Sequence, residues 1–489
     1  MHKKVLNIVW LKRDIRSQDH KVLYEAERLS EPYIIVYLFE PYIIKYQDCS
    51  PRHLGFIYQS LEDLKDRLNT CKRRLYVLYG DSPEIFSYLF KNYNVKQLIS
   101  HEEYGTAHSW KRDKRINQLC KDNNIKWLQF PKDNVIRAIK NRKHWDAHWN
   151  KEIAQEVIFN RYSAQKIDLD LEPYFLPDRF VEGIRKNIQN FQSGGETKAW
   201  QYLESFAEER GKNYHRKISK PLESRKSCSR LSPYLAWGNL SIKQVYQFIS
   251  RHENFKSSKA AFGGMLTRLK WRSHFIQKFE VECSYETICI NRAYEKMPKT
   301  QSQELLNAWK EGRTGYPMVD ANMRCLIQTG WINFRMRAML VSFLCHHLDI
   351  DWRSGVYHMA RLFLDYEPGI HYPQFQMQAG TTGVNTVRIY NPVKQAKDHD
   401  PNAQFIRQWV PELSALPEPL VYEPWKATEM EQSFYGFTLG KDYPKPIVPL
   451  EEAARRARDK IWSFRKRADV LEEARRILRT HTRRRTIQD

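Results

Sequence analysis

The sequence contains no CxxC pair, although eight cysteines are scattered between positions 49 and 345. The absence of such pairs argues against zinc ribbons and thioredoxin-like redox sites, and we expect no bound metal. Single, widely spaced cysteines are typical of proteins kept in a reducing compartment. We therefore expect a cytoplasmic protein.

Long apolar runs are also missing. No segment reaches the roughly 18 apolar residues that a membrane helix requires, so no membrane partner is predicted. The first residues, MHKKVLNIVWLKRDIR, contain too short an apolar run for a signal peptide, and charges interrupt it. No GxGxxG follows this run, so no dinucleotide is predicted on the amino-terminal part.

Acidic residues are outnumbered: 57 Asp and Glu face 80 Lys and Arg, a net charge of +23. This balance favours a polyanionic partner, with nucleic acid first, although a basic surface that serves solubility fits the charge equally well. With 42% hydrophobic residues the chain can form packed cores and is not predicted to be disordered. Its 489 residues indicate two or three domains.

Short apolar runs alternate with helical patterns over the first 130 residues. The runs are NIVWL (7–11), YIIVYLF (33–39), RLYVLY (74–79), QLIS (97–100) and IKWLQF (125–130). This alternation predicts an α/β domain with a doubly wound parallel sheet over residues 1–131. Residues 132–193, rich in charge, Asn and Pro, are predicted to be an interdomain linker, followed by a large all-α domain over 194–489.

Three stretches give local predictions. LDYEPGIHYPQFQMQ (364–378) has two prolines five residues apart, which predicts an ordered loop whose acids need a positive partner or a ligand. In KSCSRLSPYLAWGNLS (226–241), Ser232 is predicted to be a helix N-cap, a place that can hold phosphate, although most such caps bind nothing. The Arg-dense stretch from Glu451, ending THTRRRTIQD, is predicted to be an exposed basic helix or a frayed tail.

A set of longer motifs spans nearly the whole chain in one order. They are WLKRDIRSQDH (10–20), GGET (194–197), KSCSRLSPYLAWGNLS, WKEGRTGYPMVDANMR (309–324), RIYNPVKQ (388–395), DHDPNAQFIRQWVPEL (398–413), EPW (423–425) and YPKPIV (443–448). With these motifs the chain resembles the DNA photolyase/cryptochrome family. The resemblance implies an α/β antenna domain, a linker and an all-α domain that binds FAD.

The resemblance also implies which residues hold the cofactor. Those expected at the flavin phosphates or beside the flavin ring are Tyr214, Ser229, Arg230, Leu231, Ser232, Arg272, Phe334, Arg337, Asp365, Glu367 and His371. The family pairs Arg337 with Asp365, and Glu367 takes the place of a second Asp. Cys228 stands where the family usually has Thr. His371 aligns with the position facing the flavin ring, where it either titrates near neutral pH or simply bonds a loop carbonyl.

Photolyases of this family repair pyrimidine dimers in DNA by light-driven electron transfer from reduced flavin. The residues expected to contact a flipped dimer and the flanking DNA are Arg268, Trp271, Arg335 and Met377. Four of the usual cavity residues are replaced: Arg268 stands for a Glu, Phe334 for an Asn, Ala338 for a Met and Met377 for the second Trp. Repair of (6-4) lesions is less expected, because its two histidines align with Phe334 and Ala338, and the pair His346 and His347 is expected to be structural.

The resemblance assigns catalytic roles to Trp271, Arg337, Asp365, His371 and Trp352. Trp352 is the middle member of the family's tryptophan relay, but Phe375 replaces the member nearest the flavin and the outermost position falls near Lys299. The relay is therefore expected to be interrupted. Tyr366 or Tyr372 offers a hypothetical detour.

Two main hypotheses follow. The first is blue-light repair of DNA dimers by a monomeric enzyme, cyclobutane dimers being favoured, in the nucleoid if the source is prokaryotic. The second is a cryptochrome-type photoreceptor that acts through a signalling partner, and a light-independent flavoprotein on nucleic acid is a third. An antenna chromophore is left open: YGTAHSWKRD (104–113) lacks the acid of folate-binding relatives, which leaves a deazaflavin or none.

Overall fold

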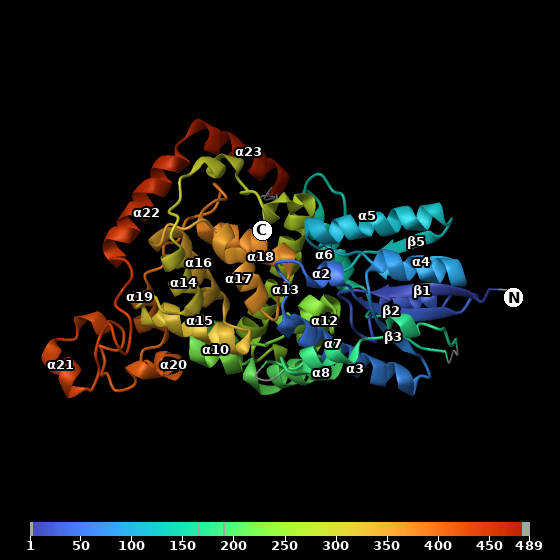
Figure 1. The fold of residues 1–489 in the computed structure, drawn as a ribbon, viewed down its shortest axis with the longest axis horizontal. Helices are drawn as coiled ribbons and strands as arrows, with labels where there is room; N and C mark the ends of the chain where they lie inside the picture. The colour runs from blue at the N-terminus through green and yellow to red at the C-terminus, as the bar shows by residue number, and fades with distance from the viewer. Residues whose placement is uncertain (1–2, 164–166, 189–190, 482–489) are drawn as a thin grey trace.

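A five-stranded parallel sheet lies at one end of the molecule and a helical region at the other (Figure 1). The computed structural model describes residues 3–163, 167–188 and 191–481. The predicted fold class, an α/β domain followed by a large helical region, is confirmed. Among these residues, no helix combines the length and the apolar composition needed to cross a membrane.

The sheet has the strand order β3-β2-β1-β4-β5. Its strands are β1 (Val5–Leu11), β2 (Tyr33–Phe39), β3 (Leu75–Tyr79), β4 (Asn94–His101) and β5 (Lys126–Phe130). All five predicted strands are present, displaced by at most a few residues. They were predictable because parallel strands covered on both faces are continuous apolar runs.

Helices cover both faces of the sheet, as a doubly wound topology requires. They are α1 (Lys21–Ala26), α3 (Pro51–Thr70), α4 (Ser82–Asn92) and α5 (Ala107–Asp122), and the one-turn helix α2 (Pro41–Ile44) follows β2 at the junction with the helical region. Val9 packs in one core cluster with Leu61 of α3, whereas its neighbour Ile8 packs in another with Phe86 of α4. Alternate residues of β1 therefore serve opposite faces.

The segment predicted to be a linker contains two helices, α6 (Trp145–Ala154) and α7 (Asp178–Arg185), and a short 3₁₀ turn. These helices were not predicted, because the segment is rich in charged residues and Asn and shows no clear helical pattern. The domain bounds 1–131, 132–193 and 194–489 stay predictions.

The helical region begins close to the predicted position 194. Its helices before the C-terminal pair are α8 (Glu196–Ser205), α9 (Tyr214–Lys217), α10 (Pro221–Ser227), α11 (Ser232–Trp237), α12 (Ile242–Arg251), α13 (Lys259–Val281), α14 (Gln303–Glu311), α15 (Pro317–Thr329), α16 (Phe334–Ser342), α17 (Arg353–Leu362), α18 (Pro368–Ala379), α19 (Pro392–His399), α20 (Gln404–Trp409) and α21 (Glu429–Phe434).

The loop predicted over 364–378 is wrong for most of its length, because α18 occupies Pro368–Ala379. Pro368 lies in the first turn, where no N–H partner is needed, and only Pro373 lies inside the helix. The predicted N-cap is also displaced by one residue: Leu231 is the N-cap of α11, and Ser232 is its first helical residue.

The basic C-terminal stretch forms two helices, α22 (Leu450–Arg465) and α23 (Ala468–His481), which arch along one edge of the helical region (Figure 1). Neither is a frayed tail. Arg476 of α23 pairs with Glu282 at 2.9 Å, and Val470 and Ile477 are buried. The predicted tail 482–489 lies outside the described residues.

The segment after β1 is inserted into the helical region. The Arg13 guanidinium lies 4.3 Å from the centre of the Trp237 ring and donates to the Tyr366 carbonyl at 2.9 Å. Asn239 Nδ2 donates to the Ile15 carbonyl at 2.9 Å, and Trp237 Nε1 donates to the Leu364 carbonyl at 2.8 Å. At Gly238 a Cβ would lie 2.4 Å from the Arg13 carbonyl oxygen, so only glycine fits there.

Candidate functional site

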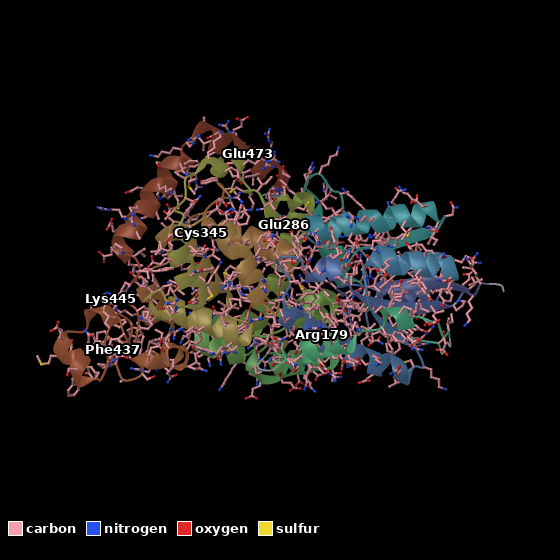
Figure 2. All side chains as sticks on the ribbon, in the orientation of Figure 1. Arg179, Glu286, Cys345, Phe437, Lys445 and Glu473 are labelled. Carbon is pink, nitrogen blue, oxygen red and sulfur yellow. The ribbon has the colours of Figure 1, made fainter. Side chains whose placement is uncertain are left out.

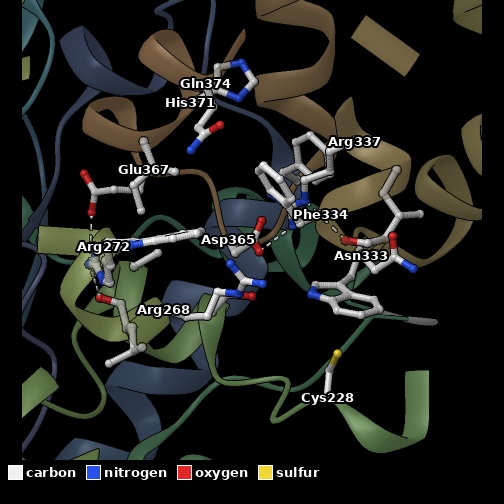
Figure 3. A pocket seen from close by; sticks show the side chains of 18 of the residues that line it. Cys228, Arg268, Arg272, Asn333, Phe334, Arg337, Asp365, Glu367, His371 and Gln374 are labelled. Carbon is white, nitrogen blue, oxygen red and sulfur yellow. Dashed lines mark hydrogen bonds and ion pairs between the residues drawn. The ribbon is translucent and has the colours of Figure 1, made fainter. Parts of the chain in front are cut away.

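The main cavity of the helical region has a volume of about 300 Å³ and is enclosed mainly by α11, α13, α16 and α18 (Figure 3). This size lies in the range of small-molecule sites. The predicted site residues in its lining are Tyr214, Ser229, Arg230, Leu231, Ser232, Arg268, Trp271, Arg272, Phe334, Arg337, Asp365, Glu367 and His371. The structure thus brings together residues up to 157 positions apart, from Tyr214 to His371.

Three predicted site residues, Arg335, Met377 and Trp352, do not belong to the described lining of this cavity. On α16 the cavity face is Phe334, Arg337, Ala338 and Val341, at helical spacing, so Arg335 points elsewhere. On α18 the face includes His371, Gln374, Phe375 and Gln378, and Met377 lies beside it. Because the prediction treated this stretch as a loop, helical periodicity was not applied to it.

Trp352 is buried away from the cavity. Its Nε1 donates to Cys289 Sγ at 3.4 Å, and the Arg353 guanidinium lies 4.9 Å from its ring centre. Phe375, in contrast, lines the cavity. Phe375 therefore occupies the relay position nearest the flavin. Phenylalanine is much harder to oxidise than the tryptophan that the family has there.

Arg337 and Asp365 form the predicted ion pair, with Nη2 and Oδ2 2.5 Å apart. The Asp365 side chain is 4% exposed and that of Arg337 is 25% exposed. The guanidinium also lies 3.8 Å from the centre of the Phe363 ring and donates to the Ile332 carbonyl. These contacts fix one cation and one carboxylate at the cavity wall.

A second ion pair joins Arg272 of α13 to Glu367, with Nη2 and Oε2 3.2 Å apart (Figure 3). The same Nη2 donates to the Leu235 carbonyl at 2.7 Å and lies 3.8 Å from Asp133 of the segment after the sheet. Asp133 was not predicted as a partner of Arg272, because it is distant in the chain and belongs to no motif. Asp365 and Glu367, the two acidic residues of the stretch 364–378, thus each have an arginine as partner.

The segment before α11 lies along the cavity next to Tyr214. Arg230 has a positive φ of 60°, and its guanidinium lies 4.2 Å from the centre of the Trp331 ring. Burial lowers the pKa of Arg230 to about 10, so it stays a cation at neutral pH. Burial raises the pKa of the Cys228 thiol to about 12, so this residue presents a neutral group where the family usually has a hydroxyl.

Two aromatic side chains stand exposed at the cavity mouth. Trp271 is 45% exposed and Phe334 is 42% exposed, although both line the cavity. The Arg268 guanidinium lies 4.7 Å from the centre of the Trp271 ring. The mouth therefore offers two ring faces and a cation to a ligand that enters from solvent.

His371 is held in one state. Its Nε2 donates to the Val356 carbonyl of α17 at 2.9 Å, and burial lowers its pKa to about 4. The hypothesis of titration near neutral pH is therefore not supported. The simpler alternative, a histidine bonded to a backbone carbonyl, describes this side chain, with the carbonyl in a helix rather than a loop. His346 is also buried and bonds the Gln378 carbonyl at 2.8 Å.

A second cavity lies at the carboxyl edge of the sheet, where open α/β sheets commonly bind ligands. Its lining includes Lys12 and Arg13 after β1, Glu40 after β2, and Glu103 after β4. Within the stretch 104–113, Arg112 pairs with Glu40 at 3.0 Å, and the His108 ring is stacked between two tyrosines, 3.8 Å from Tyr42 and 4.3 Å from Tyr46.

Asp14, His20 and His101 form a fully buried polar cluster near this edge. Asp14 Oδ2 lies 2.6 Å from His101 Nδ1 and 3.3 Å from His20 Nε2, while Leu23 N–H donates to His20 Nδ1 at 3.2 Å. Burial alone would raise the pKa of Asp14, but the hydrogen bonds from His101 and His20 hold it well below its usual range. The cluster thus contains a charged acid bonded by two imidazoles.

Comparisons with known proteins agree with this arrangement. A family model for DNA photolyase matches residues 7–147, and one for the FAD binding domain of DNA photolyase matches residues 265–463. The chain is 29% identical over 482 residues to a deoxyribodipyrimidine photo-lyase of Alkalihalophilus pseudofirmus, spanning 92% of this chain and 97% of that protein.

Two further similarities involve proteins with a different name. Over 483 residues the chain is 28% identical to cryptochrome DASH of Synechocystis sp., spanning 93% of this chain and 97% of that protein. The solved structure of a cryptochrome from Synechocystis sp. PCC6803 has a TM-score of 0.84 at 25% identity and covers 94% of this chain and 99% of its own. Both principal hypotheses are thus represented among the relatives.

Proposed function

Because this chain belongs to the photolyase/cryptochrome family and has the FAD-binding domain of that family, we propose that it uses blue light to repair pyrimidine dimers in DNA, acting as a monomer. Cyclobutane dimers are favoured over (6-4) lesions. The observation that carries the proposal is the cavity mouth, where Trp271 and Phe334 stand exposed above the paired Arg337 and Asp365.

The main cavity suits FAD. Buried polar atoms in its wall without a hydrogen-bond partner among the described residues include Arg272 Nε and Nη1 and Asp365 Oδ1. Unpaired buried groups of this kind are costly unless a ligand satisfies them. Arg230, Ser229 and Tyr214 would hold the phosphates, and Arg272, Arg337, Asp365 and Glu367 would lie around the ring system.

When bound, FAD supplies light absorption and one-electron transfer. The chain's own residues do the rest. The Arg337–Asp365 and Arg272–Glu367 pairs hold two cations at fixed positions, which stabilises negative charge in the cavity. Because His371 is neutral and bonded to Val356, it orients the wall without exchanging a proton near pH 7.

Binding of DNA is assigned to the mouth and to the basic charge of the chain. A flipped base can stack on Trp271 or Phe334, and stacking of this kind is worth about 1–3 kcal/mol per base. Arg268, held over Trp271, would meet the negative backbone or the lesion carbonyls. The net charge of +23 supports a polyanionic substrate.

One observation favours a second function, a cryptochrome-type photoreceptor without repair. The cavity lining carries Arg268, Phe334 and Ala338 at positions where repair enzymes of the family carry Glu, Asn and Met. These replacements change the charge, polarity or flexibility of the groups that would contact a dimer. A photoreceptor of this kind would need a signalling partner.

The second cavity is the place we propose for an antenna chromophore, if one binds. The stretch 104–113, whose His108 lines this cavity, lacks the acid of folate-binding relatives, which leaves a deazaflavin or no antenna as the expectation. Absorption spectra of the purified protein after removal of FAD would identify an antenna.

The test is illumination of purified, chemically reduced protein with an oligonucleotide that contains one cyclobutane dimer. Repair predicts loss of the dimer under blue light and none in the dark. Trp271→Ala should weaken binding of damaged DNA about tenfold or more at fixed salt, while FAD loading is kept. Trp462→Ala is the matched control, since Trp462 is also about half exposed but lies on α22, outside the cavity lining. Unchanged dimer with FAD bound and reduced would favour the photoreceptor.

A further inference from the structure

Four tyrosines form a continuous series between the main cavity and the second cavity. The hydroxyl oxygens of Tyr366 and Tyr372 are 3.3 Å apart. The ring centres of Tyr372 and Tyr357 are 6.2 Å apart, as are those of Tyr357 and Tyr46. These residues come from α18 and the segment before it, from α17, and from the segment after α2, so no local sequence pattern produces the series.

The series reaches the main cavity at one end. His371, which lines that cavity, has its ring centre 5.4 Å from Tyr366 and 5.6 Å from Tyr372. Phe375 of the same wall is 5.6 Å from His371. Tyr366 and Tyr372 are themselves buried, so the inner half of the series is shielded from water.

The other end approaches solvent at the junction with the α/β domain. Tyr357 and Tyr46 are partly exposed, and the His108 ring is stacked 4.3 Å from Tyr46. Tyr46 and Tyr366 both line the second cavity. An electron donor in solution can therefore meet Tyr46 and Tyr357 at the surface, whereas Tyr366 and Tyr372 are buried.

Carboxylates accompany the tyrosine hydroxyls. Tyr366 donates to Asp48 Oδ2 at 2.7 Å. Tyr46 bonds Glu286 Oε1, and the Tyr357 hydroxyl lies 3.5 Å from the same oxygen. Figure 2 shows Glu286 where the helical region meets the α/β domain. A phenol is far easier to oxidise when a base can take its proton at the same time, so this arrangement fits oxidation of tyrosine.

We propose that Tyr366, Tyr372, Tyr357 and Tyr46 carry electrons from solvent to the main cavity, in place of the tryptophan relay that Phe375 interrupts. The inference rests on the proposed binding of FAD. In the first step one electron leaves Tyr366 for the light-excited oxidised flavin, and the phenolic proton moves to Asp48 Oδ2. The radical on Tyr366 is then filled from Tyr372, Tyr357 and Tyr46 in turn, and each phenolic proton moves with its electron to the tyrosyl oxygen that is reduced, so that the radical ends on Tyr46.

The last step takes place at Tyr46. A thiol in solution gives up one electron and its proton, Tyr46 regains its phenolic hydrogen, and two such oxidised thiols combine to a disulfide. Burial raises the pKa of Asp48 to about 6, against the opposing effects of the Tyr366 hydroxyl and Arg13. Asp48 is therefore ionised at pH 8 and yet a better base than an exposed carboxylate.

The experiment uses the full chain with oxidised FAD bound, flash-excited with blue light in the presence of dithiothreitol. Two signals are recorded: the tyrosyl radical by electron paramagnetic resonance, and the rate of flavin reduction by absorbance. The variants are the double variant Tyr366→Phe/Tyr372→Phe, Asp48→Asn, and Trp352→Phe. Tyr104→Phe is the matched control, because Tyr104 is equally buried and donates to Glu102 Oε2 at 2.7 Å but lies outside the series.

The double variant should lose the radical signal and reduce flavin about tenfold more slowly or worse, equivalent to at least about 1.4 kcal/mol of barrier. Asp48→Asn keeps the side-chain volume but is a far weaker base than the carboxylate, so it should slow the first step and lose the rate difference between water and deuterium oxide. Tyr104→Phe and Trp352→Phe should behave as the unmodified protein. An unchanged radical and rate in the double variant, or loss of both in Trp352→Phe alone, would overturn the inference.

A separate repair assay distinguishes failure of the proposed function from failure of the electron route. Each variant is also reduced with dithionite and assayed for repair of a cyclobutane dimer. Absence of repair in the unmodified protein, with the tyrosyl signal present, would overturn repair and leave the electron route standing. Absence of FAD binding would overturn both.

Discussion

Replacing Arg337 tests how much the Arg337–Asp365 ion pair contributes to the stability of the main cavity. Arg337→Met keeps most of the aliphatic bulk but leaves the carboxylate of Asp365, whose side chain is 4% exposed, without its cation. Asp365 Oδ1 already has no partner among the described residues, so nothing nearby can compensate. Breaking a buried pair from one side costs about 3–5 kcal/mol. Because Arg337 is 25% exposed, we expect the lower end, about 3 kcal/mol of unfolding free energy.

The opposite change should cost less. Asp365→Asn removes the negative charge and leaves Arg337, which water and the Phe363 ring can still stabilise. We expect a loss of about 1 kcal/mol, the value of one hydrogen bond. The double variant should then be about as stable as Asp365→Asn alone, which gives a coupling energy of about 3 kcal/mol.

The assay is urea denaturation of the FAD-free protein, with the free energy of unfolding extrapolated to water. The FAD dissociation constant, measured by flavin fluorescence, should rise in both single variants. Equal losses in Arg337→Met and Asp365→Asn that add in the double variant would refute this reasoning, because independent residues add within about 0.5 kcal/mol.

Three other predictions concern groups near the cavities. The pKa of Asp48 is raised to about 6 from an ordinary 3.8, so the contribution of this residue to stability falls as pH rises from 3.8 to 6. Asp48→Asn should therefore raise the free energy of unfolding at pH 8 by up to about 3 kcal/mol, measured in urea titrations. The pKa of His371, lowered to about 4, predicts stability that falls as pH drops from 6.5 toward 4, a loss that His371→Asn should reduce in the same assay. Gly369→Ala on α18 would place a Cβ 2.8 Å from the Ile276 Cα of α13 and should destabilise by about 1–3 kcal/mol. Gly263→Ala on α13 would place a Cβ with no described atom within 4 Å apart from its chain neighbours and the backbone of its own helix, so it should be neutral or stabilising by thermal denaturation.

The sequence predicted most of what depends on local pattern. β2 coincides with the run YIIVYLF because each of its residues is buried. The Arg337–Asp365 pair, by contrast, came from the resemblance, since the two residues are 28 positions apart and no periodicity relates them. Asp133 beside Arg272 was missed for the same reason.

The error at 364–378 has a specific physical cause. Proline disfavours a helix through the N–H it lacks, and the single hydrogen bond lost at Pro373 is outweighed by the packing of α18 against α13 and α16. Tertiary contacts of this kind are not visible in a local pattern. The tyrosine series was equally hidden, because it joins position 46 to positions 357, 366 and 372 only after folding.

The insertion of the segment after β1 into the helical region has a consequence for protein engineering. Arg13 and Ile15 make hydrogen bonds across the boundary between the α/β domain and the helical region, each involving a backbone carbonyl. At the same boundary Gly238 lies too close to Arg13 for any side chain to fit. The α/β domain therefore cannot be replaced by that of a relative without also changing the helical region. A chimera that takes this domain from a relative would have to take residues 237–239 and 364–366 from the same donor. A design that ignores these contacts should yield insoluble protein rather than a folded hybrid.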